Sequence, residues 1–568
     1  MSSTALLKIP ELRDLLSGRL SQSDLCNCVR VSKAWHRDLT PPLWSTIEIF
    51  SLPQEVAFST PEARAAILRH RRLIRSFSAS DGLVLKTLGD ELLGDVNSSE
   101  TLLQSPSPND YDDRSTELRE LSWLYGTHGS SLIRLVDFSP ELRKLHVLGW
   151  EPEDSALIPL IGKLEHLKTL TILAGSSNLL PLADFRALLK HCPGSVETLR
   201  IDYSLKGDHS NSNADQMPLS PASVPPLPSE PLHRKSIRQL SLRGSALNII
   251  DKSFWSSFLS RCHELRSFSV VSPLMSWNVH EIVQIMQQYC PHLEELHLTE
   301  VGRHITDAYL ALFLSACDRP LNDTEGDTSD TINNNADFTP SILPQLHGQQ
   351  QQGTIQRRPR WKVFEVSVLP TMGPLSSEIL LAHAPSLEQI IVRDGTIMDA
   401  ALQHQLLIQS PNLTTFQVIP DRSDQESTFS FDPLLLIPPP SLQDGPLWAC
   451  ELTLRTLWLA MHPTPLSSDQ QRLVLRQLGR LHNLEELTIF NECDANHHRT
   501  RLPGFTDWSL LNGLDEMGEM KALKVVSLTG FLSACAEKER VWVFEHWPLL
   551  ERMSVGGIAF SRLEGERV

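Results

Sequence analysis

The sequence has 568 residues, of which 41% are hydrophobic and 21% are charged. This balance allows a buried core and excludes a largely disordered chain. Asp and Glu number 68 against 51 Lys and Arg, which gives a formal net charge of −17. A chain this acidic is not a general binder of nucleic acid or of anionic membrane surfaces. We therefore expect neither nucleic acid nor membrane among its partners.

The first residues and the cysteines indicate the compartment. Residues 1–10 show no basic flank followed by an apolar stretch, so no signal peptide is predicted. The apolar run 434–437 ends at prolines, far short of the roughly 20 residues of a membrane span. Nine cysteines, set mostly in apolar patterns, are typical of reduced thiols. We expect a protein of the cytoplasm, the nucleus or both.

Residues 9–20 have the apolar spacing of a short amphipathic helix. Pro10 suits the first turn of a helix, where its missing N–H is not needed. The stripe that follows consists of Leu12, Leu15, Leu16 and Leu20. A second helix is predicted after it, with Ser21 and Ser23 as candidate N-caps.

The second and third predicted helices each carry an apolar face. In the second, Leu25, Cys28 and Val29 recur at helical spacing. The third carries Trp35 four residues after Val31, and we expect it to end before Pro41 and Pro42. Three helices in about forty residues bury little apolar surface by themselves. The unit is therefore expected to pack against the rest of the chain or against a partner protein.

The order and spacing of four segments in this region resemble the F-box. These segments are 9–12, 20–25, 29–35 and 42–44. The resemblance implies a three-helix module over residues 5–49 that binds the Skp-type adaptor of a cullin-RING ubiquitin ligase. The apolar positions of the family fall on Ile9, Pro10, Leu16, Leu20, Leu25, Val31 and Trp35. The other reading is that these helices only cap the end of a repeat array.

The rest of the chain repeats one pattern: apolar, two variable, apolar, one variable, apolar. Where no insert intervenes, copies start about 25 to 28 residues apart, as in leucine-rich repeats. Weaker copies start at Ile74 and Leu118. Clear copies lie at 142–147, 167–172, 196–201, 237–242, 265–270, 293–298, 363–368, 387–392, 413–418, 454–459, 484–489, 523–528 and 550–555.

Helical patterns such as 184–191 and 279–289 lie between the predicted strands. One strand and one helix cannot bury their apolar faces alone, so the units must stack. The predicted fold class is therefore α/β: a short three-helix F-box, then an irregular leucine-rich-repeat solenoid over 50–568. Its parallel sheet would line the concave side and its helices the convex side.

Polar segments interrupt the array. They lie near 92–116, 206–234, 318–358 and 421–447, and are rich in Ser, Asn, Gln, Pro or acidic residues. Such compositions are typical of disordered loops, to which we assign no function.

No motif for catalysis or for a cofactor is found. The sequence has no Gly-x-x-x-x-Gly-Lys loop, no Gly-x-Ser-x-Gly elbow and no His-Glu-x-x-His helix. Cys26 and Cys28 are interpreted as core residues, and the cluster Cys493, His497 and His498 lacks a fourth ligand for zinc. We expect no enzyme, no cofactor and no metal. The basic run 69–72, followed by Arg75, is interpreted as a solvated helix end rather than a nuclear address or a nucleic-acid patch.

Target contacts are expected at the variable residue between the last two apolar positions of each strand, because side chains alternate across a strand. Trp458 occupies this position, where it is either an anchor of the interface with the target or a residue covered by the neighbouring insert. The predicted function is a substrate-recognition subunit of an SCF-type (cullin-RING) ubiquitin ligase, partnered through the adaptor with cullin and RING subunits. The alternative is a scaffold that assembles no ligase. The candidate target-facing residues are His146, Thr171, Arg200, His297, Ile391 and Trp458.

Overall fold

The computed structural model divides by its contacts into two units. The first comprises Met1–Ile305 with Val366–Leu369, and the second Thr306–Glu365 with Pro370–Val568. The residues that the structure describes are 9–49, 54, 56, 60–79, 117–124, 129–150, 152–174, 182–202, 235–243, 252–271, 279–299, 305–317, 360–367, 372–393, 398–419, 431–437, 448–462, 464, 466–491, 509–529, 537–555 and 558–561.

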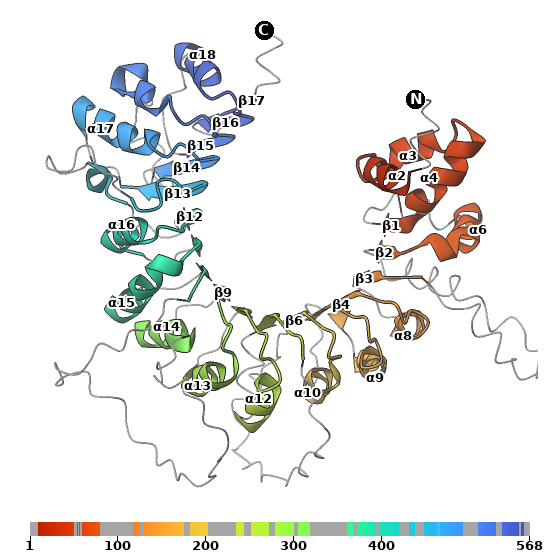
Figure 1. The fold of residues 1–568 in the computed structure, drawn as a ribbon. Coiled ribbons are helices and arrows are strands. Elements are labelled where there is room, and N and C mark those ends of the chain that lie inside the picture. The colour runs from red at the N-terminus through yellow and green to blue at the C-terminus, as the bar shows by residue number, and fades with distance from the viewer. Residues whose placement is uncertain are drawn as a thin grey trace, which may run out of the picture. The chain divides into compact units, whose positions relative to one another are not determined.

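Three helices open the first unit, as predicted: α2 (Pro10–Ser17), α3 (Gln22–Cys28) and α4 (Lys33–Ser45) (Figure 1). Ser21 caps α3 through a capping box with Asp24, so the first of the two predicted caps is the one used. Ser32 caps α4 by accepting a hydrogen bond from the N–H of Trp35 at 3.2 Å.

The predicted end of the third helix before the two prolines is wrong, because α4 continues through Pro41 and Pro42 to Ser45. Each proline removes one helical N–H donor, which costs stability. Continuing the helix places Leu43 one turn after Leu39, and both leucines then pack on the core of the three helices. Burial of this apolar face offsets the missing hydrogen bonds.

The strands of the first unit pair in chain order, each parallel to the next. All predicted strands of this part are confirmed, and β1 is an addition to them. The strands are β1 (Thr46–Ile49), β2 (Ser76–Ala79), β3 (Glu120–Leu124), β4 (Lys144–Trp150), β5 (Thr169–Ala174), β6 (Thr198–Asp202), β7 (Gln239–Arg243), β8 (Ser267–Val271) and β9 (Glu295–Thr299).

Helices connect these strands and lie on one face of the sheet (Figure 1). They include both of the helices predicted at 184–191 and 279–289. The connecting elements are α6 (Pro61–His70), η1 (Arg71–Leu73), α8 (Gly129–Asp137), η4 (Pro152–Ala156), α9 (Leu157–Ile161), α10 (Leu182–His191), α12 (Lys252–Leu259) and α13 (Val279–Tyr289).

The second unit repeats this architecture. After β10 (Val363–Ser367), whose last residues count with the first unit, strands β11 to β16 pair in parallel, and β17 turns back antiparallel to β16. The bounds are β11 (Gln389–Arg393), β12 (Thr415–Val418), β13 (Thr456–Met461), β14 (Glu486–Asn491), β15 (Val525–Thr529), β16 (Arg552–Val555) and β17 (Ile558–Ser561).

Its connections are also helical. They comprise α14 (Asp307–Leu314), η5 (Ser315–Cys317), α15 (Pro374–His383), η6 (Ala384–Ser386), α16 (Ala400–Gln409), η7 (Pro433–Leu436), α17 (Ser468–Gly479), η10 (Leu510–Asn512), η11 (Leu514–Met517) and α18 (Glu537–His546).

The apolar positions of the repeat form the core, which explains why the pattern recurs. In β4, Leu145 and Val147 are fully buried, and so is Leu142, two residues before the strand begins. The same three positions are buried in repeat after repeat, so each unit is a leucine-rich-repeat stack and the predicted fold class is confirmed.

One predicted loop is partly structured. Phe431 lies inside the expected insert 421–447, yet it is fully buried and forms a bridge with Met461. Its N–H donates to the carbonyl of Ala460 at 2.6 Å, and η7 begins two residues later. The inserts expected at 92–116, 206–234 and 318–358 lie outside the described residues.

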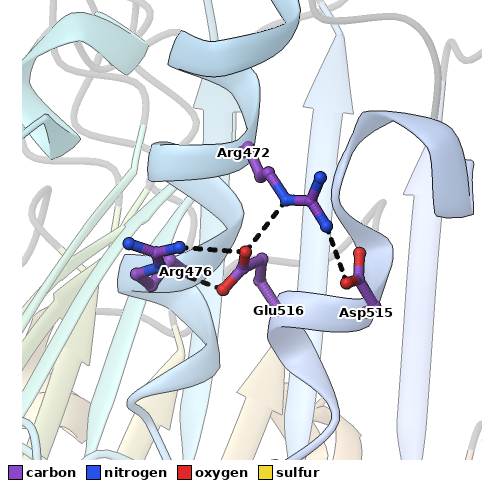
Figure 2. Close-up of polar contacts among 4 residues, drawn as sticks. All are labelled: Arg472, Arg476, Asp515 and Glu516. Atoms are coloured by element: carbon purple, nitrogen blue, oxygen red, sulfur yellow. Dashed lines mark hydrogen bonds and ion pairs between the residues drawn. The ribbon is translucent and has the colours of Figure 1, made fainter.

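A cluster of ion pairs joins α17 to η11 on the helical side of the second unit (Figure 2). The carboxylate of Glu516 accepts from Arg472 and from Arg476, each at 2.9 Å, and Asp515 pairs with Arg472 at 2.8 Å. Beside this cluster the backbones come very close, because a Cβ on Gly479 would clash with the carbonyl oxygen of Glu516. Glycine is therefore required for this packing.

Candidate functional site

Helices α2, α3 and α4 enclose a small core. Its buried side chains are Leu25 and Leu39, with 4% and 0% of their surface exposed. Gln22 joins α3 to α4, because its side-chain amide donates to the carbonyl of Leu43 at 2.8 Å. A core this small leaves the unit dependent on its neighbours. Around the two leucines pack Leu20, Cys28, Val29, Trp35 and Leu43.

The same helices expose large apolar side chains to solvent. Val31, in the turn after α3, has 68% of its surface exposed, and Leu15 in α2 has 62%. Exposed apolar groups concentrated in so short a segment are typical of a surface that binds another protein. We call the five residues the exposed apolar set: Ile9, Leu12, Leu15, Leu16 and Val31.

The seven residues that the resemblance assigns to adaptor binding take different positions. Ile9, Leu16 and Val31 belong to the exposed apolar set. Leu25 is a core residue, and Leu20 and Trp35 are half-buried against that core. Pro10 begins α2. Adaptor binding by these residues stays a prediction, with the exposed members available for contact and Leu25 engaged in the core.

Leu12 and Leu15 extend the exposed surface beyond the residues that the resemblance assigns. Both belong to the leucine stripe of the first helix, and both are exposed in the structure. The stripe is visible in the sequence. Which of its members face solvent depends on how α2 packs against α4, which spacing alone does not determine.

The three-helix unit connects to the first repeat without a linker. Helix α4 ends at Ser45 and β1 begins at the next residue. The carbonyl of Ser45 accepts a hydrogen bond from the N–H of Arg75 at 2.9 Å, next to β2. In addition, the ring of Trp44 stacks on that of His70, with centroids 4.6 Å apart. Backbone continuity and stacking therefore hold the helices firmly against the first strands.

The predicted target-facing residues of the first unit lie in one row. His146, Thr171 and Arg200 are direct register partners on β4, β5 and β6. The row continues through β7 and β8 to His297 on β9. His146 is half-buried, and burial followed by the nearby charge of Lys144 lowers its pKa. Target binding by this row stays a prediction.

Trp458 belongs to the corresponding row of the second unit, with Ile391 two strands away. Its side chain is half-buried by the next strand. The indole N–H donates to the carboxylate of Glu486 at 3.1 Å, and the ring meets Phe490 edge-on at 6.3 Å between centroids. The indole is thus held in place, with part of its surface open to a partner.

Among the described residues, no three His, Cys, Asp or Glu side chains gather closely enough to hold a metal ion. The cluster Cys493, His497 and His498 lies outside them. Cys28 packs on the helical core as predicted, but the prediction is wrong for Cys26, which is exposed. No helix in the described ranges has the length and apolar character to cross a membrane.

The fold places the chain in the class of leucine-rich-repeat proteins. No protein-family model and no curated protein matches its sequence. Among solved structures it is similar to the leucine-rich-repeat-containing protein LegL7 from Legionella pneumophila, with 11% identity, a TM-score of 0.29, and coverage of 84% of this chain and 97% of that one. Another is the complex of Rad7 and Elc1 from yeast, with 15% identity, a TM-score of 0.34, and coverage of 75% and 90%.

Proposed function

We propose that the chain is the substrate-recognition subunit of an SCF-type (cullin-RING) ubiquitin ligase. The helices α2 to α4 bind the Skp-type adaptor, and the repeats hold a target protein. The observation that carries the proposal is the exposed apolar set on a three-helix unit whose sequence resembles the F-box. Five large apolar side chains exposed in this way are unfavourable in water and favourable in an interface.

The junction between α4 and β1 supports the same function. A substrate receptor works by placing the target near the ubiquitin-charged enzyme, and a stiff connection raises the effective concentration of the target there. The direct passage from Ser45 into β1, together with the stacking of Trp44 on His70, gives such a connection. Placement of this kind requires no catalytic residue in the receptor itself.

Capture of a purified Skp-type adaptor by the full chain tests the proposal. The informative variant combines Leu16→Asp with Val31→Asp, because both side chains are exposed and neither belongs to the helical core. Leu25→Asp is unsuitable, since a buried charge would unfold the unit. The matched control is Leu511→Asp, which alters an exposed leucine in η10 of the second unit.

We expect the wild type and the Leu511→Asp control to capture the adaptor equally. The double variant should lose at least about tenfold in affinity, since two apolar contacts are replaced by charges. Circular dichroism should show the same helix content in all three proteins. Absence of capture by the wild type would reject the ligase function and leave a leucine-rich-repeat scaffold, with residues 9–45 as an end cap.

A further inference from the structure

One position of the repeat carries an unusual charge pattern in the first unit. It is the first variable position, directly after the first buried apolar residue. The backbone aligns these residues, because each carbonyl accepts two N–H groups of the next repeat; Arg119 accepts from Arg143 at 2.7 Å and from Lys144 at 2.9 Å. Neighbouring members are therefore one strand spacing apart, about 4.8 Å. In order they are Arg75, Arg119, Arg143, Lys168, Glu197, Arg238, Arg266 and Glu294.

Six of these eight residues are cations, and the first four are adjacent. We call the six the basic row: Arg75, Arg119, Arg143, Lys168, Arg238 and Arg266. All are exposed except Arg119, which is half-buried. Lys168 pairs with Glu197 at 2.7 Å. Within the part of the chain that the structure describes, Arg75, Arg119, Arg143 and Arg266 form no ion pair.

The second unit shows that the fold does not require this pattern. At the same repeat position it alternates charges that neutralise one another. Glu485 lies between Arg455, at 2.6 Å, and Lys524, at 2.5 Å, and Lys362 pairs with Glu388 at 3.9 Å. The position therefore needs only a solvated side chain. Like charges in the first unit repel one another, and a bound ligand of opposite charge would relieve that repulsion.

We propose that the basic row binds an acidic, Asp- and Glu-rich segment of a partner protein. The segment runs in an extended conformation across the strands, so that its carboxylates meet successive cations. The first four members span three strand spacings, about 14 Å, which roughly five extended residues cover. Arginine suits this role, because its planar guanidinium donates two parallel hydrogen bonds to one carboxylate.

The neighbouring side chains favour a carboxylate-bearing peptide over a nucleic acid. Beside the row, at the next position of each strand, stand Ser76, Glu120, Lys144 and Thr169. None of the four is aromatic, whereas proteins that bind single-stranded nucleic acid stack bases on aromatic rings. Glu120 is neutralised by Lys144 at 2.8 Å, so it does not repel the peptide.

The inference rests on the proposed function only in that the repeats bind a protein, and it requires no adaptor. The probe is a fluorescein-labelled decaglutamate peptide, with decaglutamine as the uncharged control, and binding to the full chain is measured by anisotropy. The test variant is Arg119→Ser with Arg143→Ser. The matched control is Arg455→Ser with Lys524→Ser, which removes two cations at the same repeat position of the second unit.

We expect decaglutamate to bind and decaglutamine not to bind. The test variant should bind about tenfold more weakly, and the control variant should match the wild type. Raising the salt from about 50 to about 300 mM should weaken binding, because exposed charges are screened. The Leu16→Asp, Val31→Asp variant should bind decaglutamate normally, which separates this test from adaptor capture.

Three outcomes would overturn the inference. The first is no binding of decaglutamate by the folded wild type at low salt. The second is equal loss in both pairs of variants, which would show a general charge effect. The third is tighter binding of a labelled deca-uridylate that depends on Arg119 and Arg143, which would assign the row to nucleic acid instead.

Discussion

Asp307 at the start of α14 accepts a hydrogen bond from the backbone N–H of Gly373, 66 residues later, at 3.0 Å. The same carboxylate accepts the N–H groups of Leu375 and Ser376, also at 3.0 Å. Gly373 is the N-cap residue of α15 and has no side chain to cap it. A Cβ there would lie 2.5 Å from the carboxylate of Asp307. One helix thus supplies the cap of the next.

Asp307→Ala should therefore destabilise the second unit. Three backbone donors at the start of α15 lose their acceptor, which costs about 1 to 2 kcal/mol. Urea unfolding followed by circular dichroism measures the change. Asp469→Ala is the matched control, because Asp469 lies in the first turn of α17, where Ser467 already provides the cap. Equal losses in the two variants would show that Asp307 acts only through helix-end charge.

The contribution of Asp307 should depend on pH. Burial raises the pKa of this carboxyl, but hydrogen bonds from Ser376, Leu375 and Gly373 outweigh burial and lower it below its ordinary value. The stabilisation is then present above the unfolded pKa, about 3.9, and is lost as pH falls through the folded pKa. The difference in unfolding free energy between wild type and Asp307→Asn should be largest near pH 7 and shrink below about pH 4. A difference independent of pH would contradict this.

Gly479→Ala should strongly destabilise the second unit. Its Cβ would clash with the carbonyl of Glu516, and the ion pairs of Glu516 hold that segment in place. We expect a loss of at least about 2 kcal/mol. Gly162→Ala is the comparison, since its nearest contact is 3.2 Å away. Thermal melting of both variants measures the difference, and similar melting temperatures would show that η11 can move aside.

The buried thiols should resist alkylation in the folded protein. Burial raises the pKa of Cys192 to about 11 and that of Cys450 to about 12, so neither forms thiolate near pH 8. Among the cysteines that the structure describes, Cys26 is exposed and should react first. Mass spectrometry after brief treatment with iodoacetamide reports the order, and treatment in denaturant gives the full reaction. Rapid labelling of Cys192 without denaturant would indicate local opening of its repeat.

The strands were predictable because most copies of the local sequence pattern have the same buried positions in the structure. Leu142, Leu145 and Val147 are spaced as a repeat strand demands, and all three are buried. The end of α4 was not predictable from local rules, because packing of Leu43 overrides the signal of the two prolines. The burial of Phe431 was missed for a similar reason. The sequence around it is polar and predicts a loop, whereas the bridge that orders it is made to Met461, thirty positions away.

The candidate site was predictable in its location but not in its detail. The resemblance to the F-box places Leu25 and Val31 in one set of apolar positions. The structure buries Leu25 and leaves Val31 exposed, a distinction that depends on the packing of α3 against α4. The basic row is the opposite case. Arg119, Arg143 and Lys168 each directly follow the first apolar residue of a repeat, so their common position is a property of the sequence pattern itself.

The antiparallel β17 has a consequence for how the repeat array ends. A stack of parallel strands finishes with an edge of unpaired backbone groups, and such an edge is a template on which another chain can grow. Residues Ile558–Ser561 fold back on β16 and occupy that edge. A short strand of reversed direction offers no continuation of the parallel register. Pairing with β17 therefore hinders the addition of another parallel strand to β16.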